Sequence, residues 1–163
     1  MGQERTTRET TYLTFYLDNE LYGLNITSVR EVLEYTTITK VPKTAEFMRG
    51  VINVRGGVVP VVDLREKFGL DISEATVDTC IVVLEVNVDG ETIVIGTIAD
   101  TVEEVVEIPP DQIEPTPKIG TKLDTEFIEG IGKMNETFLI ILDIDKIFTT
   151  EDISRVAESV EEG

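Results

Sequence analysis

The chain has 163 residues, of which 41% are hydrophobic, so it is long and apolar enough to form a packed domain. Its 14 lysines and arginines stand against 32 acidic residues, and the net charge of −18 argues against binding to a nucleic-acid backbone or to an anionic membrane surface. The sequence contains no histidine and one cysteine, Cys80, so the commonest general base and metal ligand is missing and no disulfide can form within the chain.

The first part of the chain predicts a loose lead followed by a hairpin and a short helix. Residues 1–10 are polar, whereas residues 11–18 alternate between apolar and polar and predict a strand. A turn at Asn19-Glu20 leads to a second strand over residues 21–26. Residues 27–35 predict an amphipathic helix, because a Thr or Ser cap precedes apolar residues at i, i+3 and i+4. These apolar residues are Val29, Val32 and Leu33.

Two more hairpins follow in the middle of the chain. Residues 36–44 predict an extended segment that ends near a proline. Residues 50–68 contain two apolar runs around a short break, Arg55-Gly56-Gly57, which predicts a hairpin with Arg55 at its tip. Residues 66–78 predict a helical turn and then a loop. Residues 79–98 predict a further hairpin, because Asp-Gly at its centre favours a two-residue turn.

The last part of the chain repeats this order. Residues 99–108 resemble the first predicted helix, and residues 109–122 form a proline-rich connection. Residues 127–148 predict another pair of strands. Residues 151–163 place apolar residues at helical spacing, which indicates a C-terminal helix or a tail.

The two halves of the chain are similar in sequence. Residues 47–68 align with residues 127–148 at a constant offset of 80 over 22 positions, without a gap. The identical pairs are Phe47 and Phe127, Gly50 and Gly130, Asp63 and Asp143, and Phe68 and Phe148. Upstream segments align at offsets of 71 to 73. We therefore predict an internal duplication.

The duplication and the many short strands predict a mainly β fold. We expect two small five-stranded β-barrels packed on a shared core, with short helices and a possible C-terminal helix. We expect a single domain over residues 11–153, with a first repeat over about 11–70 and a second over about 79–149. Barrels of this size are marginal alone, which is why a shared core is expected.

Positions at which the repeats agree are expected to serve packing, and positions at which they differ are candidates for function. Gly50 and Gly130 predict a bend or a close backbone approach, and Asp63 and Asp143 predict caps after their strands. Arg55 is different, because its counterpart is an asparagine. It is a solvated turn residue, a partner for an acid such as Glu31, or a residue that binds a partner protein.

Three further features argue against catalysis and membrane insertion. Cys80 lies in a β-branched run, which predicts a buried structural thiol rather than a nucleophile. Gly56-Gly57 lacks the residues of a phosphate-binding loop, and no aspartates fall at calcium-loop spacing. No apolar run is long enough to cross a bilayer, and the N-terminus has no signal-peptide core. We expect a cytoplasmic, non-enzymatic protein without a metal or a cofactor.

Four segments resemble the chemotaxis coupling proteins, the CheW family. They are LYGLNITSVREVLEY (21–35), VPKTAEFMRGVINVRGGVVPVVDLREKF (41–68), IADTVEEVVEIPPDQIEPTP (98–117) and LDTEFIEGIGKMNETFLIILDIDKIF (123–148). The resemblance runs from about residue 12 to residue 153. It implies two packed five-stranded barrels, with strands possibly exchanged between them, and an adaptor without activity of its own.

The same resemblance implies partners, a location and site residues. Family members link the cytoplasmic tips of methyl-accepting chemoreceptors to the regulatory domain of the chemotaxis histidine kinase, in arrays at the inner face of the membrane, with no direct contact to lipid or nucleic acid. The receptor-contact positions map to Val29, Glu31, Gly50 and Arg55, with Arg49 beside them as a weaker candidate. The kinase-contact residues are not identified, since apolar contact surfaces and core look alike in sequence. A coupler without a kinase or receiver segment fits this sequence best.

Two alternatives from other classes remain at this stage. A small β-barrel can bind a small ligand or an oligonucleotide, although the acidity and the 6% aromatic content oppose nucleic acid. An enzyme is disfavoured by the missing histidine and by the setting of Cys80.

Overall fold

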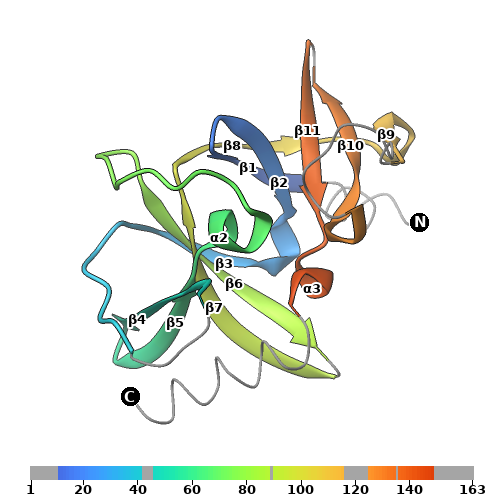
Figure 1. Ribbon diagram of the computed structural model, residues 1–163. Helices are drawn as coiled ribbons and strands as arrows, with labels where there is room; N and C mark the ends of the chain where they lie inside the picture. Colours follow the sequence, from blue (N-terminus) through green and yellow to red (C-terminus); the bar gives the residue numbers. More distant parts are fainter. Residues whose placement is uncertain (1–10, 42–45, 89, 116–124, 135, 149–163) are drawn as a thin grey trace.

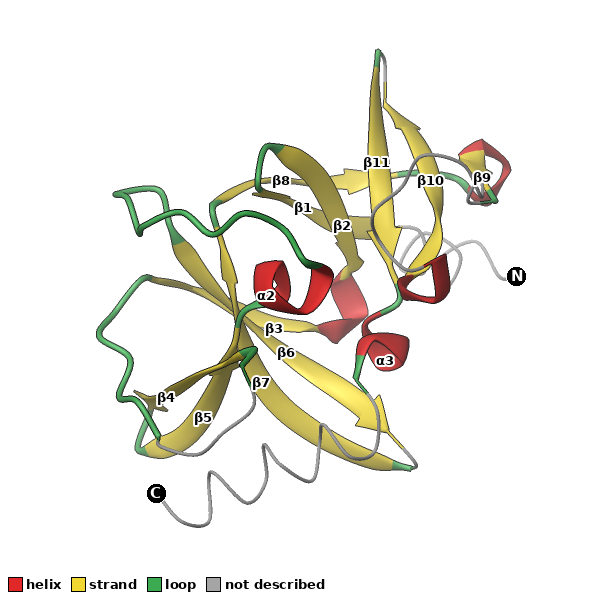
Figure 2. Ribbon diagram, viewed as in Figure 1, coloured by secondary structure: helices red, strands yellow, loops and turns green. Residues whose placement is uncertain are grey.

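The protein is mainly β in the computed structural model (Figures 1 and 2). The structure describes residues 11–41, 46–88, 90–115, 125–134 and 136–148. The loose lead and the C-terminal helix expected from the sequence lie outside these ranges.

Each repeat has three strands, then a two-stranded hairpin and a short α-helix, and the repeats differ in their 3-10 helices and in the additional strand β9. The first repeat contains β1 (Thr11–Leu17), β2 (Glu20–Asn25), the 3-10 helix η1 (Ile26–Ser28), β3 (Val29–Glu34), β4 (Met48–Val54), β5 (Gly57–Val62) and the helix α2 (Leu64–Phe68). The second repeat contains β6 (Cys80–Val88), β7 (Glu91–Ala99), β8 (Thr101–Glu107), η2 (Pro110–Gln112), β9 (Ile113–Glu114), η3 (Thr125–Phe127), β10 (Ile128–Met134), β11 (Thr137–Leu142) and α3 (Ile144–Ile147).

The repeats exchange their first hairpins. One sheet has the order β8-β1-β2-β11-β10-β9, and the other has the order β3-β6-β7-β5-β4. The hairpin β1–β2 thus pairs with strands of the second repeat, and β6–β7 pairs with strands of the first (Figure 1). Neither repeat completes a sheet by itself.

Strand register confirms that the two sheets are equivalent. The only parallel pairing among the described strands of each sheet joins Val61 to Gly96 in one and Ile141 to Gly23 in the other. Since Val61 and Ile141 differ by the offset of 80, Gly23 and Gly96 occupy the same place in the two sheets. In each sheet the chain beyond one edge strand returns to pair with the opposite edge. Thr39, which follows the edge strand β3, bridges Val51 in β4. In the other sheet β9, which follows β8, pairs with β10.

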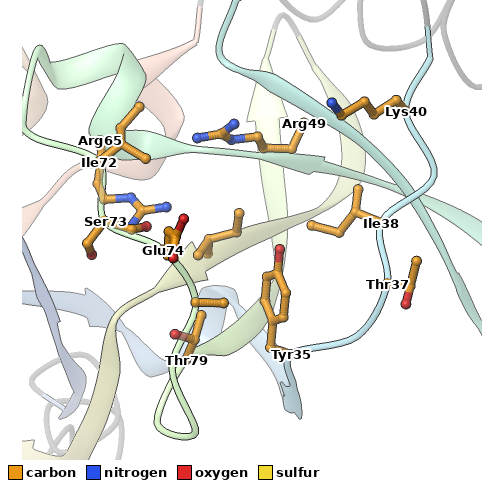
Figure 3. A pocket seen from close by; sticks show the side chains of 12 residues that line it. Tyr35, Thr37, Ile38, Lys40, Arg49, Arg65, Ile72, Ser73, Glu74 and Thr79 are labelled. Atoms are coloured by element: carbon orange, nitrogen blue, oxygen red, sulfur yellow. The ribbon is translucent and has the colours of Figure 1, made fainter.

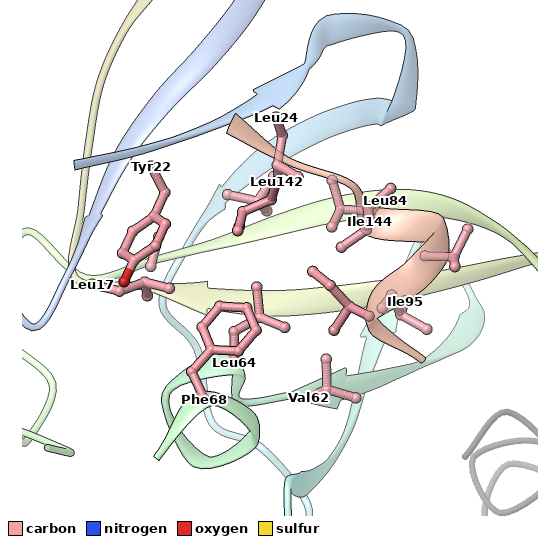
Figure 4. Packing of buried hydrophobic residues seen from close by; sticks show 14 of the residues in the cluster. Leu17, Tyr22, Leu24, Val62, Leu64, Phe68, Leu84, Ile95, Leu142 and Ile144 are labelled. Atoms are coloured by element: carbon pink, nitrogen blue, oxygen red, sulfur yellow. The ribbon is translucent and has the colours of Figure 1, made fainter. Parts of the chain in front are cut away.

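Apolar side chains form one large core between the sheets and a smaller core within each. The large core contains residues from both sheets and from both helices, including Leu17, Leu64, Leu84 and Ile144 (Figure 4). The smaller cores are equivalent to each other: one contains Tyr12, Leu139 and Ile141, and the other contains Ile81, Val59 and Val61 at the matching positions. This arrangement is the predicted pair of small β units on a shared core.

Two phenylalanine contacts mark the relation between the repeats. Phe47 packs on Phe148 with ring centroids 5.8 Å apart, and Phe68 packs on Phe127 at the same distance. Phe47 matches Phe127 and Phe148 matches Phe68 in the alignment of the repeats, so the two contacts are equivalent by the internal duplication. The four phenylalanines shared by the repeats are therefore explained by packing.

The predicted helix over residues 27–35 is wrong, and so is its counterpart over 99–108. Residues 27 and 28 belong to the single turn of η1, and residues 29–34 form the strand β3. Residues 101–107 form the strand β8. β3 carries a bulge between Val29 and Glu31, and the β1–β8 pairing shifts register opposite Leu13 and Phe15. A bulge inserts an extra residue and breaks the two-residue alternation, so the apolar spacing imitates a helix.

Two smaller expectations also needed correction. The first hairpin turns at Asp18-Asn19, one residue earlier than expected, with φ of 49° and 67°. Cys80 is only half-buried at the start of β6, not fully buried, and its thiol donates a hydrogen bond to the carbonyl of Asp78 (3.4 Å).

Candidate functional site

The tip of the β4–β5 hairpin is a two-residue turn that projects Arg55. Val54 pairs with Gly57, so Arg55 and Gly56 form the loop. Both have positive φ, 50° and 84°, which is the pattern of a type I′ turn. A positive φ is uncommon for a residue other than glycine. The backbone amide of Gly56 donates to the side chain of Asn53 (3.0 Å), which holds the turn.

Arg55 forms a two-pronged ion pair with Glu31. Its Nη1 donates to Oε2 of Glu31 at 2.6 Å, and its Nη2 donates to Oε1 at 2.8 Å. The arginine side chain is 76% exposed, whereas the glutamate is 22% exposed. Of the three alternatives that the sequence left open for Arg55, the structure shows the pairing with Glu31, which lies on a strand and not on a helix. Since β3 and β4 are opposite edges of one sheet, the ion pair joins those edges.

A shallow hollow of about 290 Å³ lies beside this ion pair. Its apolar lining is Val54, Val59, Val83 and Val94, and its polar lining is Arg30, Glu31, Arg55 and the backbone of Gly57. Val54 and Val94 are half-buried, whereas Val59 and Val83 are buried. The site therefore combines apolar surface with a fixed pair of opposite charges.

The second sheet has an equivalent hollow with different charges. It is lined by Thr14, Tyr16, Leu21, Glu103, Glu104, Met134 and Thr137. Glu103 and Glu104 take the places of Arg30 and Glu31, and Met134 takes the place of Val54. The duplication thus supplies the shape of the hollow twice, but the described residues place arginines only in the first.

The predicted receptor-contact residues do not form one cluster. Val29 is half-buried on β3, near Glu31, and it packs against the large core. Arg49 and Gly50 lie at the start of β4, whereas Arg55 follows its end. A strand rises about 3.3 Å per residue, so Gly50 and Arg55 are roughly 17 Å apart along the hairpin.

A bulge explains the positions of Arg49 and Gly50. Met48 pairs with Val62 and Gly50 with Val61, so Arg49 is the extra residue. Such bulges redirect a side chain. Gly50 has a φ of 144°, and a Cβ there would collide with the backbone carbonyl of Thr39. The close approach predicted for Gly50 is confirmed. The absence of a side chain at Gly50 allows the segment that follows β3 to pair with β4.

Arg49 and Arg65 converge on the buried carboxylate of Asp63. Arg65 donates to both carboxylate oxygens from Nε and Nη2, each at 2.9 Å. Arg49 donates to Oδ2 from Nε (3.0 Å) and Nη2 (2.9 Å). Burial alone would raise the pKa of Asp63, but hydrogen bonds and charges from Arg65 and then Arg49 outweigh it and hold the pKa below its usual range.

This network also ties the exchanged hairpin to the rest of the fold. Arg65 Nη1 donates to Asp100 at the end of β7 (2.8 Å), and Asp100 accepts from the backbone amide of Asp18 in the β1–β2 turn (2.8 Å). Asp63 caps α2 through the amide of Arg65 (3.0 Å), as predicted. Asp143 occupies the N-cap of α3, but its side chain makes no capping bond.

Sequence reasoning missed Arg65, although a signal was present. Arg65 aligns with Asp145, and Arg49 aligns with Glu129, so both arginines are specific to the first repeat. In the second repeat partial burial raises the pKa of Glu129, the nearby negative charge of Asp143 raises it further, and Lys146 lowers it. The comparison that singled out Arg55 applies equally to Arg49 and Arg65.

The described part of the chain contains no group of three or more Asp, Glu, Cys or His side chains placed to hold a metal ion. Within the same ranges, no helix has the length and apolar character needed to cross a bilayer.

Comparisons with known proteins agree with the resemblance found in the four sequence segments. A family model described as the CheW-like domain matches residues 11–152. A chemotaxis protein CheW from Klebsiella aerogenes is 36% identical over 145 residues, covering 89% of this chain and 85% of the relative. One from Bacillus subtilis is 31% identical over 140 residues, covering 85% and 86%. The crystal structure of the scaffolding protein TtCheW from Thermoanaerobacter tengcongensis superposes with a TM-score of 0.77 at 38% identity, covering 88% and 90%.

Proposed function

This chain belongs to the CheW-like family of chemotaxis scaffold proteins, and from that premise we propose that it links the cytoplasmic tips of chemoreceptors to the regulatory domain of the chemotaxis histidine kinase. In this proposal the protein works in the cytoplasm, within receptor arrays at the inner face of the membrane. It has no catalytic step of its own, and it transmits receptor state by contacting both partners.

The observation that carries the proposal is the hollow beside the Arg55–Glu31 ion pair. A receptor tip that presents a helix offers an apolar stripe flanked by polar side chains. The valines of the hollow fit the apolar stripe, and the exposed guanidinium of Arg55 fits an acidic or amide side chain beside it. Glu31 uses two of the guanidinium N–H groups and leaves the others for a partner.

The remaining mapped residues take different roles in this proposal. Val29 lies on the same strand as Glu31 and extends the apolar surface where it is exposed. Gly50 acts indirectly, because it fixes the segment that follows β3. Arg49 points to Asp63 and lies at the opposite end of β4, so we assign it no direct receptor contact.

Each contact in such an assembly is expected to be modest by itself. Receptor and kinase contacts on separate surfaces would strengthen one another when several copies are held together. The equivalent hollow of the second sheet is more acidic. Two hollows of similar shape and different charge would suit two different partners.

Co-sedimentation tests the proposal directly. The full chain is mixed with a receptor cytoplasmic fragment and, separately, with a kinase regulatory domain from the same organism. Binding to each partner, and a ternary complex when both are present, is expected. Binding to neither partner contradicts the proposal, and retention of a single-stranded oligonucleotide instead supports the barrel-binding alternative.

A further inference from the structure

A second cavity, of about 480 Å³, lies at the other end of the same hairpin. It opens between the segment after β3, the start of β4 and the loop after α2 (Figure 3). Arg49, at the start of β4, is six positions before Arg55, so the cavity is roughly 20 Å from the ion pair along the strand. Its size is that of a ligand pocket.

Two cationic side chains lie on one side of this cavity. Figure 3 shows Lys40 and Arg49 on the same side of the cavity, with the guanidinium of Arg49 directed away from Lys40, while Glu74 lies across from them. Within the described residues, Lys40 is exposed and has neither a hydrogen bond nor an ion pair. Arg49 is fixed by Asp63 through Nε and Nη2, which leaves its Nη1 donors for another group. In a protein of net charge −18, Lys40 stands out because its charge has no acidic partner among the described residues.

The fold does not require these cations. At the matching positions of the second repeat, Arg49 is replaced by Glu129 and Arg65 by Asp145. The pairing of Thr39 with Val51 and of Glu114 with Ile131 makes Pro115 the counterpart of Lys40. The cationic wall is therefore an addition to the first repeat.

The rest of the cavity has both polar and apolar side chains, and its apolar part continues onto the surface. Tyr35, Ile38 and Ile72 line it, and Tyr35 and Ile72 remain 41% and 43% exposed. Tyr35 follows β3 where the second repeat has the buried Ile108, so the exposed ring is also specific to the first repeat. Val77, on the same loop as Ile72, is fully exposed. An apolar rim around a cavity is typical of a surface that a protein covers.

We propose that this cavity docks a protein segment in which an acidic side chain lies beside a large aliphatic one. The carboxylate pairs with the ammonium of Lys40, and the aliphatic group packs on the apolar side chains that line the cavity. A free small acid would fill the cavity and leave the rim exposed, whereas a polypeptide covers both. This site is separate from the proposed receptor-facing hollow.

The test is an NMR titration of the 15N-labelled full chain with the blocked pentapeptide Ac-Gly-Leu-Glu-Leu-Gly-NH2. Shifts are expected in the amides of Thr37–Lys40 and Ser73–Ala75, at concentrations up to about 20 mM, because short ligands bind weakly. Replacing Glu by Gln in the peptide is expected to weaken binding about tenfold, the discrimination typical of a lost charged contact. Lys40→Ala is expected to weaken it roughly threefold to tenfold.

Lys133→Ala is the matched control, since Lys133 is an exposed lysine on the other sheet that pairs with Glu114 (3.2 Å). It should bind the peptide as the wild type does. Three results overturn the proposal: no shifts at the cavity residues, equal binding of the Gln peptide, or equal binding of free 4-methylpentanoate. Receptor co-sedimentation of Lys40→Ala should match the wild type, which separates this site from the hollow at Arg55.

Discussion

Asp63 and Arg65 form a buried ion pair at the junction of β5 and α2 in the first repeat. Both side chains are almost fully buried, and two hydrogen bonds of 2.9 Å join them. The pair connects the end of β5, the start of α2 and, through Asp100, the hairpin exchanged from the other sheet.

Removing the charge of Asp63 should therefore be costly. Asp63→Asn removes the buried counter-charge of the Arg65 guanidinium and leaves only Asp100, which is partly exposed. Removing one partner of a buried ion pair typically costs about 3–5 kcal/mol. Chemical denaturation measures the loss. Asp143→Asn is the control, because Asp143 is half-buried and its ion pair with Lys146 spans 3.7 Å on the surface; it should cost less than about 1 kcal/mol. Equal losses would show that the network adds nothing specific.

Gly50 should be the least replaceable of the glycines in the β4–β5 hairpin. Gly50→Ala places a methyl group against the carbonyl of Thr39 at a φ of 144°, and a loss of roughly 2–4 kcal/mol is expected from strain and displaced backbone. Gly56→Ala is the control: its φ is 84°, but nothing lies within 4 Å of the added Cβ, so only the conformational cost of about 1 kcal/mol applies. The order of the two midpoints in urea checks this, and a reversed order would contradict it.

Tyr22 should make stability fall at alkaline pH. Burial, together with the charges of Glu20 and Asp18, raises the pKa of Tyr22 to about 12 from 10.0. Below pH 10 both folded and unfolded chains keep the proton, so the stability is fully present; between pH 10 and 12 only the unfolded chain releases it, and stability is lost. Tyr22→Phe should flatten the free energy of unfolding over that range. An unchanged slope would show that Tyr22 is not the group responsible.

The duplication and the mainly β class were predictable from the sequence, and the ion pair between Arg55 and Glu31 was one of three alternatives that it left open. Each rests on a signal within the chain: a gapless match of 22 residues, frequent turn residues, and one cation at a turn where the repeat has none. The resemblance to the family was also readable, because the segment around Gly50 and Asp63 carries its most specific motif.

The exchange of hairpins was not predictable from residue patterns. The strands β1–β2 and β6–β7 have the same apolar pattern, so either hairpin satisfies the pairing rules of either sheet. Tertiary pairing also overrode the helical spacing of Val29, Val32 and Leu33, since the bulge at Arg30 shifts the strand by one residue. Long-range contacts decide both features, and no local pattern contains them.

A charge swap separates structural and binding roles of the Arg55–Glu31 pair. Exposed ion pairs contribute about 0–1 kcal/mol, so the double variant Glu31→Arg with Arg55→Glu should keep the fold. If the pair acts only within the protein, the swap restores receptor binding that Arg55→Glu alone removes. We expect no restoration, because the partner meets a reversed charge. Restored binding in co-sedimentation would limit Arg55 to a structural role.

The most direct measurement is receptor-dependent kinase activation in a reconstituted mixture with Arg55→Asn. Asparagine tolerates the positive φ of the turn and stands at the matching position, residue 135, so the fold should be retained. We predict that affinity for the receptor fragment falls about tenfold or more, as for a binding hot spot, that activation falls with it, and that binding to the kinase regulatory domain is unchanged. Wild-type activation together with wild-type receptor co-sedimentation would contradict the assignment of the receptor-facing site to Arg55.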